Sequence, residues 1–227
     1  MAVHFEDGGK RFVTQLFSKS ANSLARMSII IGVFTLAGAG AVGALFYRSP
    51  YYTNQNVVRS QPVPFSHEHH VAGLGIDCRF CHFNVETSAY AGIPPTHVCM
   101  TCHSQVWTEA GVLEPVRESY RTGESIEWQK VHRLADYAYF NHSAHINKGV
   151  GCASCHGQVD DMRLMFQNET LQMSWCLECH REPERFVRPK DEVFNMAWTA
   201  VDQKALGAQL VEEYDIQSKV TCTTCHR

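Results

Sequence analysis

The chain has 227 residues, a length that allows one or two domains, and it contains ten cysteines, thirteen histidines and a formal net charge of -3. Because lysine and arginine are only scattered after residue 48, the charge pattern does not indicate nucleic-acid binding. Ten cysteines in a chain of this size indicate either disulfides or bound metal, and their spacing decides between the two.

Residues 1–26 are predicted to form a cytoplasmic amphipathic segment. Apolar residues recur there at near-helical spacing, with lysine and arginine between them. This pattern fits a short helix on the cytoplasmic face of a membrane, and it fits a helix docked on a partner protein equally well. The apolar residues are Phe12, Val13, Leu16, Phe17 and Leu24.

Residues 27–47 are predicted to form an uncleaved transmembrane helix, because they carry no charge and are numerous enough to span a bilayer. Basic residues precede the segment and Arg48 alone follows closely, which places the N-terminus in the cytoplasm and residues 48–227 outside. A cleaved signal peptide is the alternative, but the apolar run is too long for one. Its many small residues fit close packing against other membrane subunits.

Residues 48–64 read as an extended linker. The remaining residues, 65–227, are predicted to form a mainly α-helical, loop-rich domain with little β structure. Apolar residues at helical spacing predict one longer helix in this domain, over residues 192–214.

All ten cysteines fall into five Cys-x-x-Cys-His motifs, the attachment signature of c-type haem. Each cysteine adds across one vinyl group, and the adjacent histidine then reaches the iron as its proximal ligand. Zinc knuckles and disulfides are the alternatives, but neither needs a histidine after each cysteine pair, and five pairs is an odd number for four-ligand zinc sites. The predicted attachment residues are Cys78, Cys81, Cys99, Cys102, Cys152, Cys155, Cys176, Cys179, Cys222 and Cys225, and the proximal histidines are His82, His103, His156, His180 and His226.

An internal repeat precedes the first and the third motif. Each copy holds a phenylalanine and two histidines and is followed by two Cys-x-x-Cys-His motifs, whereas the fifth motif lies outside the repeat. We therefore expect a duplicated two-haem module over residues 65–139 and 140–190, with a fifth haem in residues 191–227. The copies read Phe65-Ser-His67-Glu-His-His70 and Phe140-Asn-His142-Ser-Ala-His145.

The paired histidines of the repeat are predicted to be distal iron ligands, since neutral imidazole suits iron. Two histidines three residues apart share a helix face, and each iron has one free axial position, so each pair should serve two different haems. The predicted distal ligands are His67, His70, His142 and His145.

His132 is predicted to be the fifth distal ligand, with His97, Met173 and Met196 as competitors. If all five irons have two histidine ligands, no coordination position is open to a substrate. The sites are therefore predicted to transfer electrons, and no residue is assigned a catalytic role.

Several stretches together resemble the pentahaem cytochrome subunit of alternative complex III, a bacterial quinol-oxidising respiratory complex. The resemblance covers nearly the whole chain. The stretches are Phe65-Ser-His-Glu-His-His, Leu74-Gly-Ile-Asp-Cys-Arg-Phe-Cys-His, Ile93-Pro-Pro-Thr, Tyr139-Phe-Asn-His-Ser-Ala-His, Gly149-Val-Gly-Cys and Met173-Ser-Trp-Cys-Leu-Glu-Cys-His.

This resemblance implies five covalent haem c groups on the periplasmic face of the inner membrane, in contact with membrane lipid. It implies a large iron–sulfur partner related to molybdopterin enzymes, and polytopic membrane subunits that bind quinol. Electrons would pass to a monohaem cytochrome c or a terminal oxidase, and the chain would be no enzyme by itself. The alternative is a self-sufficient membrane-anchored multihaem quinol dehydrogenase that feeds periplasmic reductases.

Overall fold

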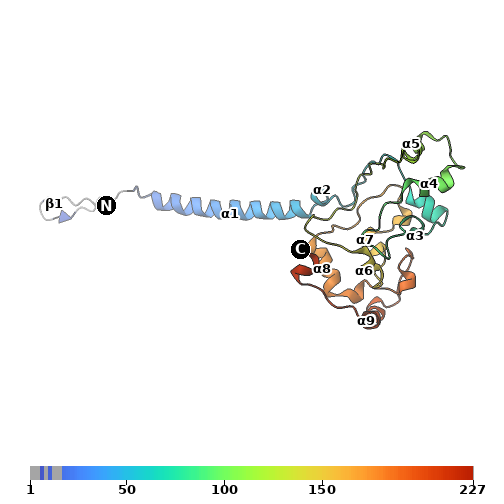
Figure 1. The fold of residues 1–227 in the computed structure, drawn as a ribbon. Helices are drawn as coiled ribbons and strands as arrows, with labels where there is room; N and C mark the ends of the chain where they lie inside the picture. Colours follow the sequence, from blue (N-terminus) through green and yellow to red (C-terminus); the bar gives the residue numbers. More distant parts are fainter. Residues whose placement is uncertain (1–5, 8–9, 12–16, 227) are drawn as a thin grey trace. The chain divides into compact units, whose positions relative to one another are not determined.

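The computed structural model describes residues 6–7, 10–11 and 17–226. The chain divides into two compact units, Met1–Ser49 and Pro50–Arg227 (Figure 1). We describe each unit by itself.

The first unit consists mainly of one long helix, α1 (Ala21–Arg48), preceded by the short antiparallel strands β1 (Glu6–Asp7) and β2 (Lys10–Arg11). Helix α1 is long and apolar enough to cross a membrane, and none of its side chains is buried within the protein. A helix with this many apolar side chains needs a membrane or another chain to cover them. Part of the predicted N-terminal amphipathic helix, including Phe12, Val13 and Leu16, lies outside the described residues.

The second unit begins with α2 (Pro50–Thr53), and the segment after it, predicted as a linker, is held by hydrogen bonds. Gln55 and Gln167 form a parallel β-bridge, and the side chain of Gln55 donates to the carbonyl of Asn168 at 2.7 Å. The buried Gln167 amide donates in turn to the carbonyls of Thr53, at 3.1 Å, and of Glu169, at 2.8 Å. Because a buried amide must be paired, Gln167 fixes the start of this unit.

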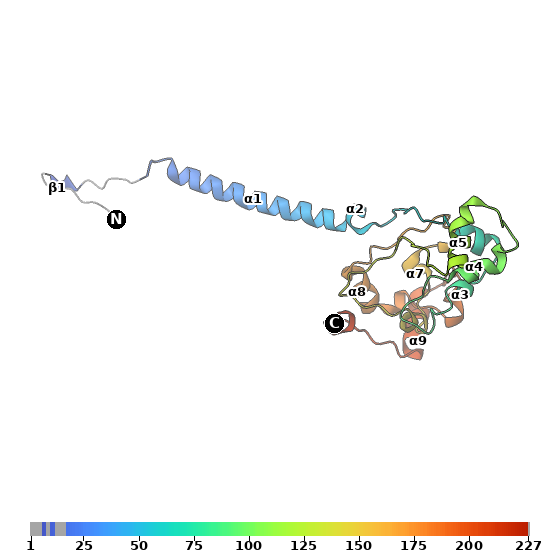
Figure 2. The ribbon, with the colours of Figure 1, turned by 45° about the horizontal axis from the view of Figure 1, so that its top comes forward.

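The second unit is helical and loop-rich, as predicted, and its helices are short (Figure 2). Each Cys-x-x-Cys-His motif lies on a single helical turn, which brings cysteines three residues apart onto one side. The helices are η1 (Glu68–Gly73, a π-helix), α3 (Cys78–Cys81), α4 (Thr96–His103), η2 (Gly111–Leu113), α5 (Glu114–Thr122), α6 (His142–Ile146), α7 (Ala153–His156), η3 (Val159–Asp161), α8 (Met173–Arg181), η4 (Pro183–Arg185), η5 (Lys190–Glu192), α9 (Gln203–Glu213) and α10 (Cys222–Cys225).

Side-chain caps set the start of several helices. Asp77 accepts a hydrogen bond from the backbone N–H of Arg79 at 2.8 Å, where α3 begins. Asn141 accepts one from the N–H of Ala144 at 3.3 Å, where α6 begins. Such caps satisfy backbone donors that a first helical turn leaves unpaired, so the local sequence positions these short helices.

The prediction of a helix over residues 192–214 is wrong for the first half of this range. The helix begins only at Gln203, because Asp202 caps it by accepting from the N–H of Ala205 at 3.0 Å. Val193 and Met196 are buried from a loop instead, whereas Val201 is fully exposed. The apolar pattern therefore reflects burial of an irregular segment rather than one face of a helix.

The apolar core of the second unit is sparse. Among the described residues, ten apolar side chains are buried, and six of them form two small clusters. One cluster contains Val63, Leu113 and Val116, and the other contains Val85, Ile146 and Val193. A domain of this length normally buries a larger continuous core, so aliphatic side chains alone do not account for its interior.

We predict that Gly207→Ala destabilises the protein. A methyl group at position 207 of α9 would lie 1.8 Å from the carbonyl oxygen of Glu184 in η4, so two backbone segments would have to separate. Overpacking of this kind costs about 1–3 kcal/mol. Thermal unfolding of the haem-loaded protein, followed by circular dichroism, should show a lower midpoint. The matched variant is Gly111→Ala, whose methyl group meets no atom within 4 Å and which should unfold at the same temperature as the parent. Equal unfolding midpoints for the two variants would contradict the packing argument.

Candidate cofactor sites

The five motifs define five candidate cofactor sites in the second unit. All ten cysteines are free thiols, which leaves them available for covalent attachment. Within the described residues, no three side chains of His, Cys, Asp or Glu converge as a metal site. Numbered in chain order, site 1 is Cys78, Cys81 and His82, site 2 is Cys99, Cys102 and His103, site 3 is Cys152, Cys155 and His156, site 4 is Cys176, Cys179 and His180, and site 5 is Cys222, Cys225 and His226.

Backbone carbonyls orient three of the proximal histidines. The Nδ1 atom of His82 lies 2.8 Å from the carbonyl oxygen of Gly92, and that of His103 lies 3.1 Å from the oxygen of Val106. The Nδ1 atom of His226 lies 3.1 Å from the oxygen of Tyr137. Since a carbonyl can only accept, Nδ1 carries the proton and Nε2 is left with a free lone pair for a metal.

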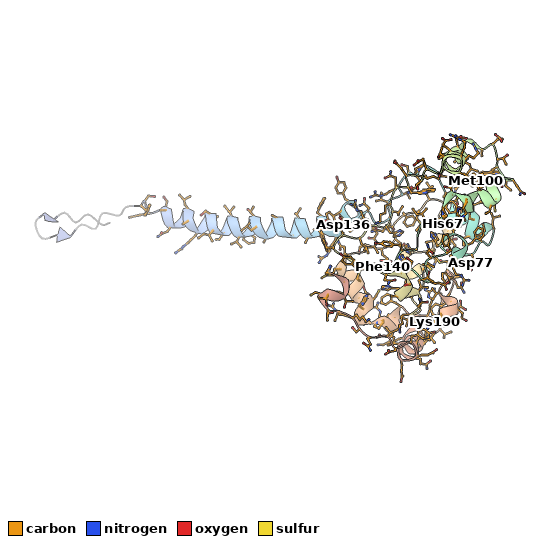
Figure 3. All side chains as sticks on the ribbon, viewed as in Figure 1. His67, Asp77, Met100, Asp136, Phe140 and Lys190 are labelled. Carbon is orange, nitrogen blue, oxygen red and sulfur yellow. The ribbon has the colours of Figure 1, made fainter. Side chains whose placement is uncertain are left out.

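The two copies of the repeat have the same local geometry. The phenylalanine ring meets the first histidine ring edge-on, with centroids 4.9 Å apart in the first copy and 4.8 Å apart in the second. It stacks on the second histidine ring, with centroids 4.3 Å apart in the first copy and 4.4 Å apart in the second. Both copies lie in the second unit (Figure 3). The similarity supports the predicted duplication. The residues are Phe65, His67 and His70 in the first copy, and Phe140, His142 and His145 in the second.

The second histidine of each copy has its ring fixed by the chain just before it. The Nδ1 atom of His70 donates to the carbonyl of Ser66 at 2.8 Å, and that of His145 donates to the carbonyl of Asn141 at 2.7 Å. Both rings therefore present Nε2 away from their own backbone, as a distal ligand must.

Three of the predicted distal histidines each face a different proximal histidine, and the separation is nearly the same in all three pairs. The ring centroids lie 6.3 Å apart for His70 and His103, 6.4 Å for His142 and His156, and 6.1 Å for His145 and His180. A metal–imidazole bond is roughly 2.0–2.1 Å long and the centroid lies about 1.1 Å beyond the nitrogen, so two imidazoles across one iron have centroids roughly 6.3 Å apart. These three pairs therefore fit haem irons at sites 2, 3 and 4.

His67 lies beside His82 of site 1. Burial, with smaller contributions from the nearby His82 and His70 rings, lowers the pKa of His67 to about 4. The Nδ1 atom of His67 is buried without a hydrogen-bond partner among the described residues. A buried, neutral imidazole is the form that binds iron, so His67 fits the distal position of site 1.

His132 contacts the proximal histidine of site 3. Its Nε2 atom lies 3.1 Å from Nδ1 of His156, and the two ring centroids are 4.3 Å apart. This separation is too short for the two rings to lie on opposite sides of one iron, so the contact is a hydrogen bond between imidazoles. Distal ligation of an iron by His132 stays a prediction.

The competing candidates for the fifth distal position differ in exposure. His97 lies exposed on α4, and Met173 is exposed at the start of α8. Met196 is buried in the loop before α9. Sequence reasoning missed the carbonyls that orient the proximal rings, because they come from loops whose path the sequence does not reveal.

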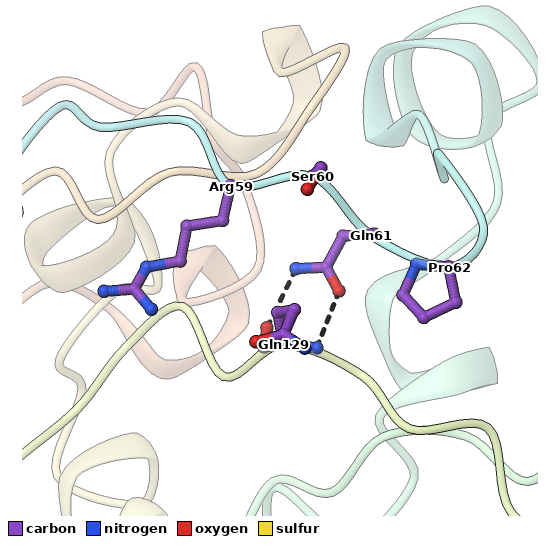
Figure 4. Close-up of a pocket in the computed structure, with 5 residues that line it drawn as sticks. All are labelled: Arg59, Ser60, Gln61, Pro62 and Gln129. Carbon is purple, nitrogen blue, oxygen red and sulfur yellow. Dashed lines mark hydrogen bonds between the residues drawn. The ribbon is translucent and has the colours of Figure 1, made fainter.

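A polar pocket of about 450 Å³ lies elsewhere in the second unit (Figure 4). It is lined by Arg59, Ser60, Gln61, Pro62 and Gln129. The Gln61 side chain spans it, donating to the carbonyl of Gln129 at 2.8 Å and accepting from its N–H at 2.9 Å. Since no cysteine or histidine lines this pocket, it is not part of the cofactor sites.

Comparison with known proteins supports the assignment made from the geometry. Residues 138–227 match the family of cytochrome c7 and related cytochrome c. The chain is also similar to the multihaem cytochrome c subunit of a menaquinone reductase from Nitratidesulfovibrio vulgaris, with 29% identity over 143 residues that cover 54% of this chain and 68% of that subunit. Both similarities are to c-type cytochromes, the class of electron-transfer protein that the five motifs and the facing histidines indicate.

We predict that His145→Met raises the reduction potential of one haem without loss of covalent haem. Methionine is a weaker donor than imidazole to ferric iron, so the ferrous state gains relative stability. A redox titration followed by absorption, together with a haem count by the pyridine haemochrome assay, measures both quantities. The control is His69→Met, an exposed histidine of the first repeat, which should titrate like the parent. An unchanged titration for His145→Met would remove this residue from the ligand set.

Proposed function

We propose that this chain is a five-haem subunit that relays electrons for a quinone-linked membrane complex. The observation that carries the proposal is the set of three facing histidine pairs, each at the separation of an iron with two imidazole ligands. The first histidine of the first repeat, His67, extends the same arrangement to site 1.

Five haems are proposed because five complete motifs occur and every cysteine belongs to one of them. When bound, each haem supplies a one-electron redox centre. The protein orients the axial ligands and shields the iron from water. With both axial positions filled by histidine, a haem has no position for a substrate, which favours electron transfer over haem-centred catalysis.

We propose that α1 anchors the cytochrome in the inner membrane, with the N-terminus in the cytoplasm and the haem domain in the periplasm. The apolar side chains of α1 are uncovered within the protein, and basic residues are concentrated on its N-terminal side. In this arrangement α1 contacts lipid and other membrane subunits.

For the complex itself, we propose a quinol-oxidising assembly of the alternative complex III type. Its polytopic membrane subunits would bind quinol, and a large iron–sulfur subunit related to molybdopterin enzymes would pass electrons to this cytochrome. A monohaem cytochrome c or a terminal oxidase would accept them. The sequence stretches around the repeats and motifs support this proposal.

A second candidate is an assembly that reduces menaquinone, because the similar Nitratidesulfovibrio subunit is named as part of a menaquinone reductase. Electrons would then flow through this chain toward the membrane quinone instead of away from it. Both candidates place a multihaem cytochrome in a membrane complex with quinone, and they differ in the direction of electron flow.

We predict that the full-length cytochrome with a C-terminal tag co-purifies with an iron–sulfur protein and polytopic membrane subunits after mild solubilisation. Mass spectrometry identifies the chains, with membranes from an untagged strain as the control. Addition of a menaquinol analogue should then reduce the haems of the isolated assembly, as followed by absorption. If quinol leaves the haems oxidised while menaquinone oxidises pre-reduced haems, the menaquinone-reducing assembly replaces the first candidate.

Purification of the cytochrome alone, still able to oxidise quinol, would contradict both complexes. It would instead support a self-sufficient quinol dehydrogenase.

A further inference from the structure

Sites 1 and 2 are joined by one short segment. His67 directly precedes η1 and lies near His82 of site 1, whereas His70 within η1 faces His103 of site 2 at 6.3 Å between ring centroids. In both ribbon views, α3 with the cysteines of site 1 lies beside α4 with those of site 2 (Figures 1 and 2). The distal ligands of these two sites are therefore separated by less than one turn of the chain.

Sites 1 and 3 are joined by the loop after the first motif. Ala89 in this loop accepts two hydrogen bonds from His142, from its backbone N–H at 3.1 Å and from its Nδ1–H at 2.9 Å. Val85 of the same loop belongs to the buried cluster that packs against Cys152 of site 3. The first module thus holds the ring that faces the iron position of site 3.

Sites 3 and 4 are joined by α6. His142 at its start faces His156 of site 3 at 6.4 Å, and His145 one turn later faces His180 of site 4 at 6.1 Å. The second copy of the repeat therefore joins its two sites as the first copy does.

Sites 4 and 5 are joined through the C-terminal segment. The hydroxyl of Ser218, just before the fifth motif, donates to the carbonyl of His180 at 2.6 Å. In both ribbon views the C-terminus lies beside α8, which carries the fourth motif (Figures 1 and 2). The fifth motif therefore lies against the fourth.

The outermost positions belong to sites 2 and 5. In both ribbon views, α4 and the C-terminus lie at opposite ends of the second unit, with α3, α7 and α8 between them (Figures 1 and 2). Exposure agrees with this placement, since Cys102 of site 2 and Cys222 of site 5 are the two exposed cysteines among the ten. All cysteines of sites 1, 3 and 4 are at least partly buried.

We propose that the five haem sites form a single unbranched row in the order 2–1–3–4–5, with sites 2 and 5 at its ends. The proposal rests on the proposed function in one respect, namely that all five motifs carry haem. The spatial order differs from the chain order at the first module, where the second motif is the outer one. The terminal sites, 2 and 5, are the ones that redox partners can approach most closely.

The test is a site-resolved redox titration of the purified full-length cytochrome, comparing His70→Met with His142→Met. Met ligation raises the reduction potential of the altered haem, so this haem is reduced first. Its added electron lowers the potentials of neighbouring haems by charge repulsion, and this effect weakens with distance. For His70→Met, at the end of the row, the midpoint potential of site 1 alone should fall. For His142→Met, in the middle, the potentials of sites 1 and 4 should both fall.

A downward shift at site 4 or 5 as large as that at site 1 in His70→Met would overturn the row. If either variant fails to fold, an experimental structure of the unmodified haem-loaded cytochrome decides, because iron–iron distances must then be shortest for the pairs 2–1, 1–3, 3–4 and 4–5. A close approach of sites 2 and 5 would overturn the order. A pyridine haemochrome count below five would instead contradict the proposed five-haem function. Identification of a different partner complex would leave the proposed order of the sites unaffected.

Discussion

Two imidazoles that bind one iron must face each other at a fixed separation, and three of the predicted axial pairs in the second unit meet this requirement. The rings come from segments far apart in the chain, as His145 and His180 do, yet they lie 6.1 Å apart between centroids. Backbone carbonyls hold the Nδ1 atom of most of these rings, so each ring presents Nε2 in one direction. The axial positions thus depend on the loop backbone, which explains how a unit with short helices can hold rings in defined orientations.

The sparse aliphatic core follows from the same arrangement. The two buried clusters lie next to motif cysteines: Cys99 packs against the cluster of Val63, and Cys152 packs against the cluster of Val85. Haem attached at these cysteines adds apolar surface where the side chains supply little. Folding of this unit is therefore expected to be coupled to cofactor attachment, as in small metal-binding domains whose ligands come together only in the folded state.

The sequence predicts the chemistry of the sites better than their spatial arrangement. The Cys-x-x-Cys-His motifs and the repeat are local patterns, and the structure gives both copies of the repeat the same ring geometry. The placement of His132 against His156 could not be predicted, because it depends on how a loop folds onto a distant motif. The helix predicted from residue 192 failed for a related reason, since burial of Val193 in an irregular segment gives the same apolar pattern as a helix face. Docking of the predicted linker depends on the amide of Gln167, which periodicity does not detect.

The predicted duplication would explain why the proposed row of sites and the chain follow different orders. Each histidine pair joins the two sites of its own module, so two separate modules would give the pairs 1–2 and 3–4. The contact of His142 with Ala89 joins them through sites 1 and 3, which makes sites 2 and 4 the outer sites of the duplicated part. The C-terminal addition then covers site 4, as the bond from Ser218 to the carbonyl of His180 indicates, and moves that end of the row to site 5. A two-site module, one duplication and one short extension are therefore sufficient to build a row whose ends lie at opposite sides of the unit.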